Sequence, residues 1–223
     1  NSENIIEIGP GKGVLTKFLI KKKVNIKLIE IDNDCVEIIK NKFPKINIIH
    51  NDFLTINLKE IGVERYSIIG NFPYNISSQI LFKILENRDD IYEVVGMFQK
   101  EVANRICSKP RSKQYGILSV LTQAYFECEH LFDVSPDNFN PIPQVQSSVI
   151  KITRNKIAKL DCNHNHFVKV VKGAFSQRRK KLKNALKNFT NLNDEKLALS
   201  ILKFDNTNVL LEETCPIPLL TLL

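Results

Sequence analysis

The sequence lacks closely spaced cysteines, although it contains five of them. Zinc sites use close pairs of cysteines, and the disulfide frameworks of secreted proteins are short and dense. Scattered cysteines are typical of reduced thiols in an intracellular protein. Two histidines, His164 and His166, are close in sequence, but residues two positions apart do not share a helical face. We therefore expect no metal site.

Long apolar runs and an export leader are also missing. No stretch reaches about 18 uncharged apolar residues, which argues against a transmembrane helix. No basic segment followed by an apolar one opens the chain, so we expect a cytoplasmic protein, without a membrane partner and monomeric. The chain begins at Asn1 almost directly in a strand and without a methionine. We expect that an N-terminal segment is missing from this sequence.

Acidic residues are outnumbered by basic ones. The chain has 223 residues, a net charge of +8 and a pI near 9.2. That excess favours a polyanionic partner, but charge alone does not distinguish a nucleic acid from an acidic membrane surface. The length allows one large domain and a small second one, and 43% hydrophobic residues predict a substantial core.

Short apolar runs alternate with helix-like segments up to about residue 99. Such alternation predicts βαβ units, a parallel sheet and right-handed crossovers. The expected strands are 5–8, 26–31, 46–50, 67–70 and 94–98, and the expected helices are 14–19, 35–41 and 76–85.

The pattern changes after residue 99. Two helices are expected at 100–107 and 117–124, and two strands at 125–134 and 147–153. The segment 137–144 contains two prolines and must be a loop. Two late strands joined by a loop predict an antiparallel edge on an otherwise parallel sheet.

No strand is expected after residue 155, where helices at 166–189 and 195–203 are predicted. The sequence therefore predicts a Rossmann-like α/β domain over 1–155 and a small helical domain over 156–223.

A glycine-rich turn follows the first expected strand. Gly9 and Gly11 can adopt positive φ and let a ligand approach the backbone, and Pro10 keeps the chain extended as it leaves the strand. The dinucleotide fingerprint is G-x-G-x-x-G, and here Val14 occupies the position of its last glycine. The match to a nicotinamide site is partial, and a tight turn without a ligand remains an alternative.

Two acids extend this pattern. Glu30 ends the second expected strand and can accept hydrogen bonds from two ribose hydroxyls. Asp52 follows the third strand and can accept from an adenine amino group, which Phe53 can flank. Each acid alone could be a solvated strand end. Together with the glycine turn they suit an adenosine-containing ligand without a pyrophosphate, such as S-adenosylmethionine.

The fourth expected strand ends in Gly70-Asn71-Phe72-Pro73-Tyr74-Asn75. Ligands of open parallel sheets bind at the carboxyl ends of the strands. The amide of Asn71 and a backbone carbonyl can accept the two N–H groups of an adenine amine, Pro73 helps to aim the carbonyls beside it, and Tyr74 can stack on the base. A proline turn with a buried tyrosine is the structural alternative.

These motifs resemble those of the KsgA-type small-subunit ribosomal RNA adenine-N6,N6-dimethyltransferases, over nearly the whole chain. The matching pieces include Glu7-Ile8-Gly9-Pro10-Gly11, Glu30-Ile31-Asp32, Asn51-Asp52, Asn71-Phe72-Pro73-Tyr74, Gln99-Lys100-Glu101-Val102, Phe139-Asn140-Pro141-Ile142-Pro143 and Gln177-Arg178-Arg179-Lys180. Phe72 departs mildly from the usual leucine or isoleucine. This chain also begins after the family's Gln-x-Phe-Leu-like segment, which closes over the cofactor.

The resemblance implies a class I methyltransferase that dimethylates two adjacent adenines near the 3′ end of small-subunit ribosomal RNA, in ribosome biogenesis. S-adenosylmethionine would be the methyl donor, S-adenosylhomocysteine the product, and no metal would be needed. The implied cofactor residues are Gly9, Gly11, Glu30, Asp52 and Asn71. The implied catalytic residues are Asn71, Pro73, Tyr74 and Phe139, with the two aromatic rings covering the two faces of a flipped base.

The segment 162–192 contains no acidic residue and many basic ones. A lysine-rich helix is often only a solvated face, but this excess favours contacts with RNA phosphates, which should be sensitive to salt. The predicted RNA-binding residues are Arg178, Arg179, Lys180 and Lys181.

Two other functions remain open. The first is a methyltransferase that acts on large-subunit RNA and confers antibiotic resistance. The second is a ribosome-assembly factor that keeps the fold and the basic surface without catalysis. A DNA adenine methyltransferase would more typically carry Asp/Asn-Pro-Pro-Tyr, which is absent here.

Overall fold

A computed structural model describes residues 4–22, 24–110, 112–156, 160 and 163–176. Over these residues, none of the helices has both the length and the apolar character that a membrane span needs. The expected helix at 195–203, the end of the one at 166–189, and Arg178, Arg179, Lys180 and Lys181 lie outside the described residues.

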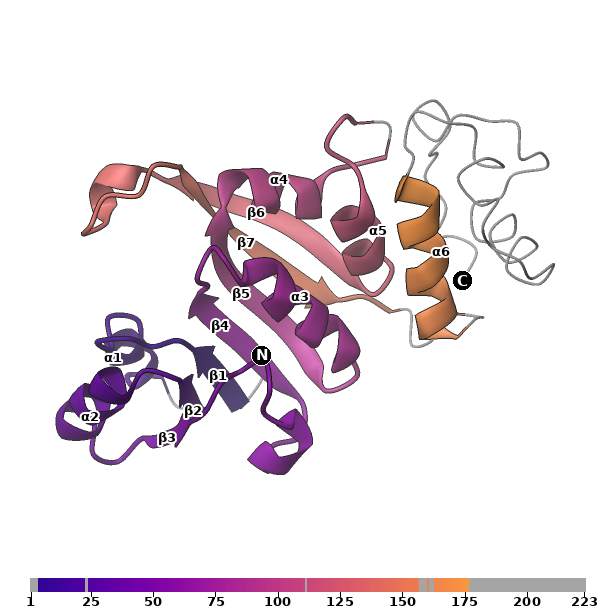
Figure 1. The fold of residues 1–223 in the computed structure, drawn as a ribbon. Helices are drawn as coiled ribbons and strands as arrows, with labels where there is room; N and C mark the ends of the chain where they lie inside the picture. The colour runs from indigo at the N-terminus through magenta and orange to yellow at the C-terminus, as the bar shows by residue number, and fades with distance from the viewer. Residues whose placement is uncertain (1–3, 23, 111, 157–159, 161–162, 177–223) are drawn as a thin grey trace, which may run out of the picture. The chain divides into compact units, whose positions relative to one another are not determined.

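The described strands form one seven-stranded sheet in the order β3-β2-β1-β4-β5-β7-β6 (Figure 1). Pairing is parallel from β3 through β5, and β7 pairs antiparallel to β5 with Ser147 opposite Gln99. The prediction of a Rossmann-like parallel sheet with an antiparallel edge is confirmed. The strands are β1 (Asn4–Ile8), β2 (Asn25–Glu30), β3 (Asn47–His50), β4 (Tyr66–Asn71), β5 (Ile91–Gln99), β6 (Phe126–Val134) and β7 (Ser147–Arg154).

The helices begin and end where local chemistry requires. Asp32 caps α2 by accepting a hydrogen bond from Cys35 N, and this helix ends just before Pro44. α3 buries its apolar stripe, including Ile80 and Ile84. The elements are α1 (Thr16–Leu19), α2 (Asn33–Lys42), η1 (Leu58–Ile61), α3 (Ser77–Glu86), α4 (Lys100–Cys107), α5 (Ile117–Gln123), η2 (Pro136–Asn138) and α6 (His164–Ser176).

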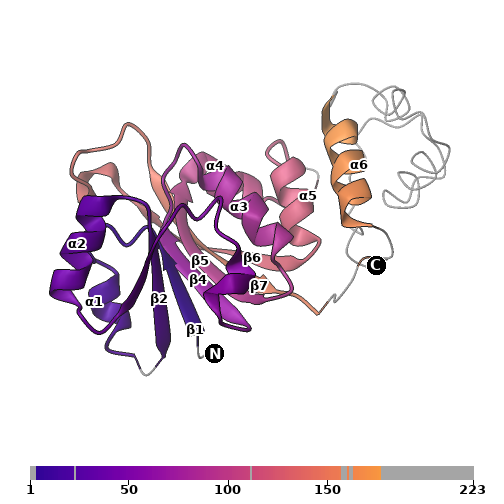
Figure 2. The same ribbon diagram turned by 60° about the horizontal axis from the view of Figure 1, so that its bottom comes forward.

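Two compact units divide the chain. The first comprises Asn1–Ala103 and Glu127–Arg154, and the second comprises Asn104–Phe126 and Asn155–Leu223. The second unit thus takes α5 as well as α6, which lie side by side in Figure 2. The predicted domain division at residue 155 stays a prediction.

Tyr125 contacts Asn155, His164 and Phe167 in the described part of the second unit. Its backbone oxygen accepts from Asn155 N, and its ring packs edge-on against Phe167. Its hydroxyl lies 2.8 Å from Nδ1 of His164. His164 is therefore a packing residue of α6. The described residues contain no group of three or more potential metal ligands.

Candidate active site

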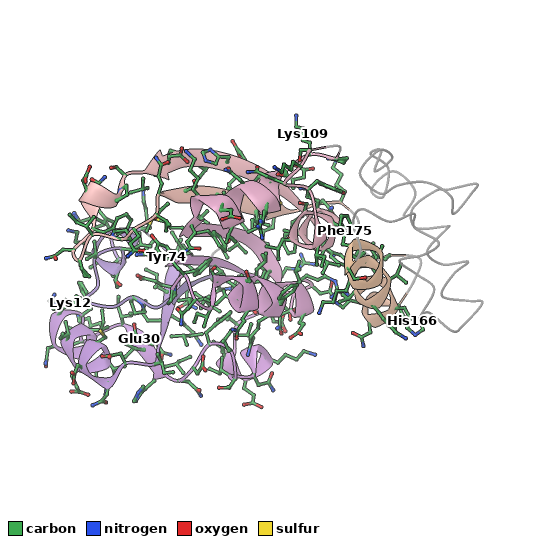
Figure 3. All side chains as sticks on the ribbon, turned by 45° about the horizontal axis from the view of Figure 1, so that its top comes forward. Lys12, Glu30, Tyr74, Lys109, His166 and Phe175 are labelled. Carbon is green, nitrogen blue, oxygen red and sulfur yellow. The ribbon has the colours of Figure 1, made fainter. Side chains whose placement is uncertain are left out.

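The predicted site residues of the first unit gather at one edge of the sheet. The glycine turn follows β1, Glu30 ends β2, Asp52 follows β3 and Asn71 ends β4, and these four strands are parallel. Figure 3 labels Lys12, Glu30 and Tyr74 of this edge. The loop with Phe139 joins β6 to β7, and β7 begins opposite the end of β5. The topology thus brings Phe139 to the same edge.

The glycine turn is open where a ligand would approach. Gly9, Gly11 and Gly13 have φ of 63°, 54° and 80°. A Cβ at Gly9 or Gly11 would meet no heavy atom within 4 Å, whereas one at Gly13 would lie 2.6 Å from the ring of Phe43. Gly13 is therefore required by packing against α2, and Gly9 and Gly11 leave their backbone accessible.

Glu30 supports this turn. Its Oε2 accepts from Gly11 N at 3.0 Å, and its Oε1 accepts from Ile31 N at 2.9 Å and Asp32 N at 3.0 Å. A carboxylate offers about four lone-pair sites, so three are engaged. One remains on Oε2, which suits one ribose hydroxyl more readily than the two expected from the sequence.

Asp52 can still bind a ligand through its side chain, whereas Phe53 cannot. Oδ1 of Asp52 accepts from Leu54 N at 2.8 Å, and Oδ2 accepts no hydrogen bond from the described residues. Phe53 is only 5% exposed, and the ammonium of Lys83 lies 5.6 Å from its ring centroid. Phe53 is therefore a core residue, and the geometry does not support its expected place beside an adenine.

Glu7 is a site residue whose role sequence reasoning missed. It is 1% exposed at the end of β1, and its Oε2 accepts from Thr16 Oγ1 at 2.8 Å. This bond joins β1, before the glycine turn, to the first residue of α1, after it. Burial is the main reason why the pKa of Glu7 rises to about 7. The available signal was an acid in an apolar strand directly before the glycines.

Glu7 should make stability depend on pH. Its folded-state pKa lies above the ordinary value of 4.5, so the folded state holds the proton more tightly and its contribution is lost as pH rises toward 7. Between pH 5 and 7 the free energy of unfolding should fall by about 2 kcal/mol relative to Glu7→Gln. Urea unfolding of both proteins across this range tests it, and a constant difference would contradict it.

The side chains of the Asn71–Tyr74 motif alternate between solvent and core. Asn71 and Pro73 are exposed, and Phe72 is fully buried between them. The ring of Phe72 packs edge-on against Phe98, with centroids 5.1 Å apart. It occupies the space left by two glycines, because a Cβ at Gly96 would lie 2.3 Å from it and a Cβ at Gly70 would lie 2.8 Å from it. Phe72 thus anchors the motif to the core.

The backbone carbonyls of the motif are not equivalent. The oxygen of Pro73 accepts from Ile76 N at 3.1 Å in the turn that leads into α3. The oxygen of Phe72 accepts no hydrogen bond from the described residues, while its N donates to Met97 O at 3.2 Å. Because Phe72 is completely buried, its unpaired oxygen is not open to a ligand, whereas Pro73 is exposed and its oxygen keeps one lone pair.

Tyr74 is held by a contact that the sequence does not reveal. Its ring is half-buried, and its hydroxyl is hydrogen-bonded to Oγ of Ser147, the first residue of β7. Phe139 is also partly exposed, and its N donates to Pro136 O at 3.0 Å. The contacting pairs of aromatic rings in the described part of the chain do not include Tyr74 with Phe139.

Tyr74 and Ser147 should contribute to catalysis through the one hydrogen bond that they share. Tyr74→Phe and Ser147→Ala should each lower single-turnover methyl transfer about fivefold, the effect of one hydrogen bond worth about 1 kcal/mol. The double variant should be no slower than either single variant, because both remove the same bond. Multiplying effects would show that the two residues act independently.

Known proteins are similar to this chain over most of its length. The model of the family "Ribosomal RNA adenine dimethylase" matches residues 1–214. The chain is 53% identical to the ribosomal RNA small subunit methyltransferase A of Flavobacterium johnsoniae over 196 residues, which is 86% of this chain and 75% of that protein. It is 46% identical to the protein of the same name from Cytophaga hutchinsonii over 206 residues, 91% and 79% of the two chains.

Solved structures share the fold. A dimethyladenosine transferase from Plasmodium falciparum has a TM-score of 0.74 and 24% identity, covering 90% of this chain and 70% of that one. The 23S rRNA methyltransferase ErmE has a TM-score of 0.72 and 22% identity, covering 96% and 86%. At these identities the likeness shows the fold alone. The family model and the close relatives carry the assignment: this chain belongs to the ribosomal RNA adenine dimethylase family.

Proposed function

We propose that this protein transfers methyl groups from S-adenosylmethionine to N6 of two adjacent adenines near the 3′ end of small-subunit ribosomal RNA. The product would be N6,N6-dimethyladenosine, made during ribosome biogenesis. One observation carries the proposal. The amide of Asn71 is exposed at the carboxyl edge of β4, on a motif fixed by buried Phe72, at the same edge as an open glycine turn. The names of the close relatives support the choice of substrate.

The cofactor residues fit an adenosine-containing methyl donor. The open backbone at Gly9 and Gly11, the remaining lone pair of Glu30 and Oδ2 of Asp52 offer the acceptors and the space that it needs. S-adenosylmethionine supplies, when bound, a methyl group made electrophilic by its sulfonium. Glu7 and Thr16 hold the turn in its open form.

The acceptor residues orient a poor nucleophile. The lone pair of an adenine amine is delocalised into the ring, so the amine must be turned in line with the methyl carbon. The amide oxygen of Asn71 can accept one N–H, and a backbone carbonyl can accept the other. The oxygen of exposed Pro73 keeps one lone pair beside its bond from Ile76 N, so it is a more accessible partner than the carbonyl of buried Phe72. No strong base is needed, since the proton can leave after the attack.

Two methylations on one nitrogen change these requirements. After the first transfer the amine keeps a single N–H, so only one of the two acceptors is then used. Stacking must hold the base in both rounds, and it is worth roughly 1–3 kcal/mol per base. Tyr74, fixed by Ser147, would cover one face and Phe139 the other.

Net charge and the names of the relatives both support an RNA partner. We propose that Arg178, Arg179, Lys180 and Lys181 contact phosphates of the small-subunit RNA, which makes binding sensitive to salt. A monomer acting in the cytoplasm on immature small subunits fits this proposal.

Methyl transfer onto immature small ribosomal subunits, with mass spectrometry of the digested nucleosides, tests the function. N6,N6-dimethyladenosine is the expected product, and a methylated cytosine or protein would contradict the proposal. Transfer to large-subunit RNA instead would favour the antibiotic-resistance type. Binding of small subunits without any transfer would favour an assembly factor.

A further inference from the structure

The loop of residues 135–146, which carries Phe139, is held at both ends by one side chain. Lys100 is the first residue of α4, directly after β5. Its Nζ donates to Oδ2 of Asp133 at 2.6 Å and to Oε1 of Gln146 at 2.9 Å. Asp133 lies near the end of β6, and Gln146 directly precedes β7. One ammonium group therefore joins the two stems of the loop.

Further bonds fix these stems. Lys100 N donates to Gln146 O at 2.9 Å, so backbone and side chain hold the same residue. Oδ1 of Asp133 accepts from Ser148 Oγ at 2.6 Å and lies 2.9 Å from Nε2 of His130. The bonds from Lys100, and then those from Ser148 and His130, hold the pKa of Asp133 well below its usual range. Asp133 is thus a charged acceptor throughout the neutral range.

The same stem also holds Tyr74. Ser147 lies between Gln146 and Ser148 and makes the hydrogen bond to the Tyr74 hydroxyl. Gln146 and the first two residues of β7 therefore connect the ring of Tyr74 with the bonds that Lys100 and Asp133 make. A movement of this stem would displace the loop and disturb the fixed tyrosine.

We propose that Lys100 is a positioning residue, which fixes the stems of the 135–146 loop so that Phe139 covers the second face of the target base. This inference rests on the proposed function. The side chains of Lys100 and Asp133 are 39% and 33% exposed, and exposed ion pairs add little to global stability. Geometry at a reacting centre is more sensitive, because a displacement of about 1 Å can cost about 100-fold in rate.

The chain offers both a reporter and a matched control. It contains no tryptophan, so Phe139→Trp introduces a single indole fluorophore into the loop. Lys151 of β7 pairs with Glu129 of β6 at 2.9 Å, with side chains 37% and 60% exposed. Lys151→Met therefore removes an ion pair of β6 with a similarly exposed lysine, away from the stems of the loop.

The experiment combines two readouts. In the Phe139→Trp background, time-resolved anisotropy of the introduced indole should show faster local motion with Lys100→Met and no change with Lys151→Met. With Phe139 in place, Lys100→Met should lower single-turnover methyl transfer about tenfold, a modest loss beside the 100-fold that a misplaced group can cost. The affinity for S-adenosylmethionine should stay within about twofold. Lys100→Arg should restore both readouts, since a guanidinium can bond to both stems.

Each outcome decides the inference. If the motion of the introduced indole is unchanged with Lys100→Met, the bonds from Lys100 to Asp133 and Gln146 do not fix the loop. If the motion is faster but the rate of methyl transfer is unchanged, Lys100 has no positioning role. Equal losses in Lys151→Met would show a general effect of the ion pairs made by β6, which also overturns the inference. If the unmodified protein transfers no methyl group to any RNA, the proposed function fails, and anisotropy still decides whether Lys100 fixes the loop.

Discussion

Replacing Asn71 by alanine should lower the single-turnover rate of methyl transfer by about 100- to 1,000-fold, the usual effect of losing one preorganised polar partner at a reacting centre. Asn71 is exposed at the end of β4 and does not support the core. Its amide is also the side-chain acceptor proposed to turn the adenine amine toward the methyl group. Folding and RNA binding should therefore remain.

Three controls make this result specific. Asn75→Ala removes an exposed amide from the same loop and should keep its activity. Because Asn71 is also an expected cofactor residue, calorimetry gives the concentration of S-adenosylmethionine that saturates each variant, at which the rates are compared. Filter binding should give similar affinities for small subunits. A rate for Asn71→Ala within about threefold of the unmodified protein, which is far smaller than the usual effect of such a loss, would rule out the proposed role of this amide.

The second large effect concerns stability. Phe72→Ala should reduce the free energy of unfolding by about 3–5 kcal/mol, as large aromatic residues in a tight core do when they are truncated. The ring of Phe72 is completely buried, packs against Phe98 and fills the space above two glycines. Phe72→Leu should cost much less, about 1 kcal/mol, because most of the volume remains. Urea unfolding followed by circular dichroism measures both.

Gly96 provides the complementary test. A methyl group at Gly96 would lie 2.3 Å from the ring of Phe72, so Gly96→Ala should be destabilising by about 1–3 kcal/mol through overpacking. In the Phe72→Ala background the same change should cost less, because the ring of Phe72 is gone and only the contact with the ring of Phe98 at 2.9 Å remains. Additive effects would mean that Phe72 and Gly96 do not share the space that the structure assigns to them.

The local features of this fold were predictable from the sequence. Alternating apolar runs located the seven strands to within a few residues, and the prolines at 141 and 143 marked the loop before β7. The order of glycine turn, Glu30, Asp52 and Asn71 predicted that these residues share one edge, because parallel strands bring their carboxyl ends together. Periodicity and topology were sufficient for this part.

The remaining features depend on contacts between distant segments. Tyr74 and Ser147 are 73 positions apart, and no local pattern links Phe72 to Gly96 or Lys100 to Asp133. The three backbone bonds of Glu30 depend on the path of the turn, which positive-φ glycines set. Phe53 looked like a ligand contact because it follows Asp52, yet burial makes it part of the core. Spacing in the sequence does not reveal which face of a chain is covered.

The most direct test uses S-adenosylmethionine with a deuterated methyl group and immature small subunits that lack the modification. Mass spectrometry of ribonuclease fragments should place two labelled methyl groups on N6 of each of two adjacent adenines near the 3′ end of the RNA, and Asn71→Ala should leave them unlabelled. Label at any other position, or equal labelling by Asn71→Ala, would contradict the proposed site and reaction.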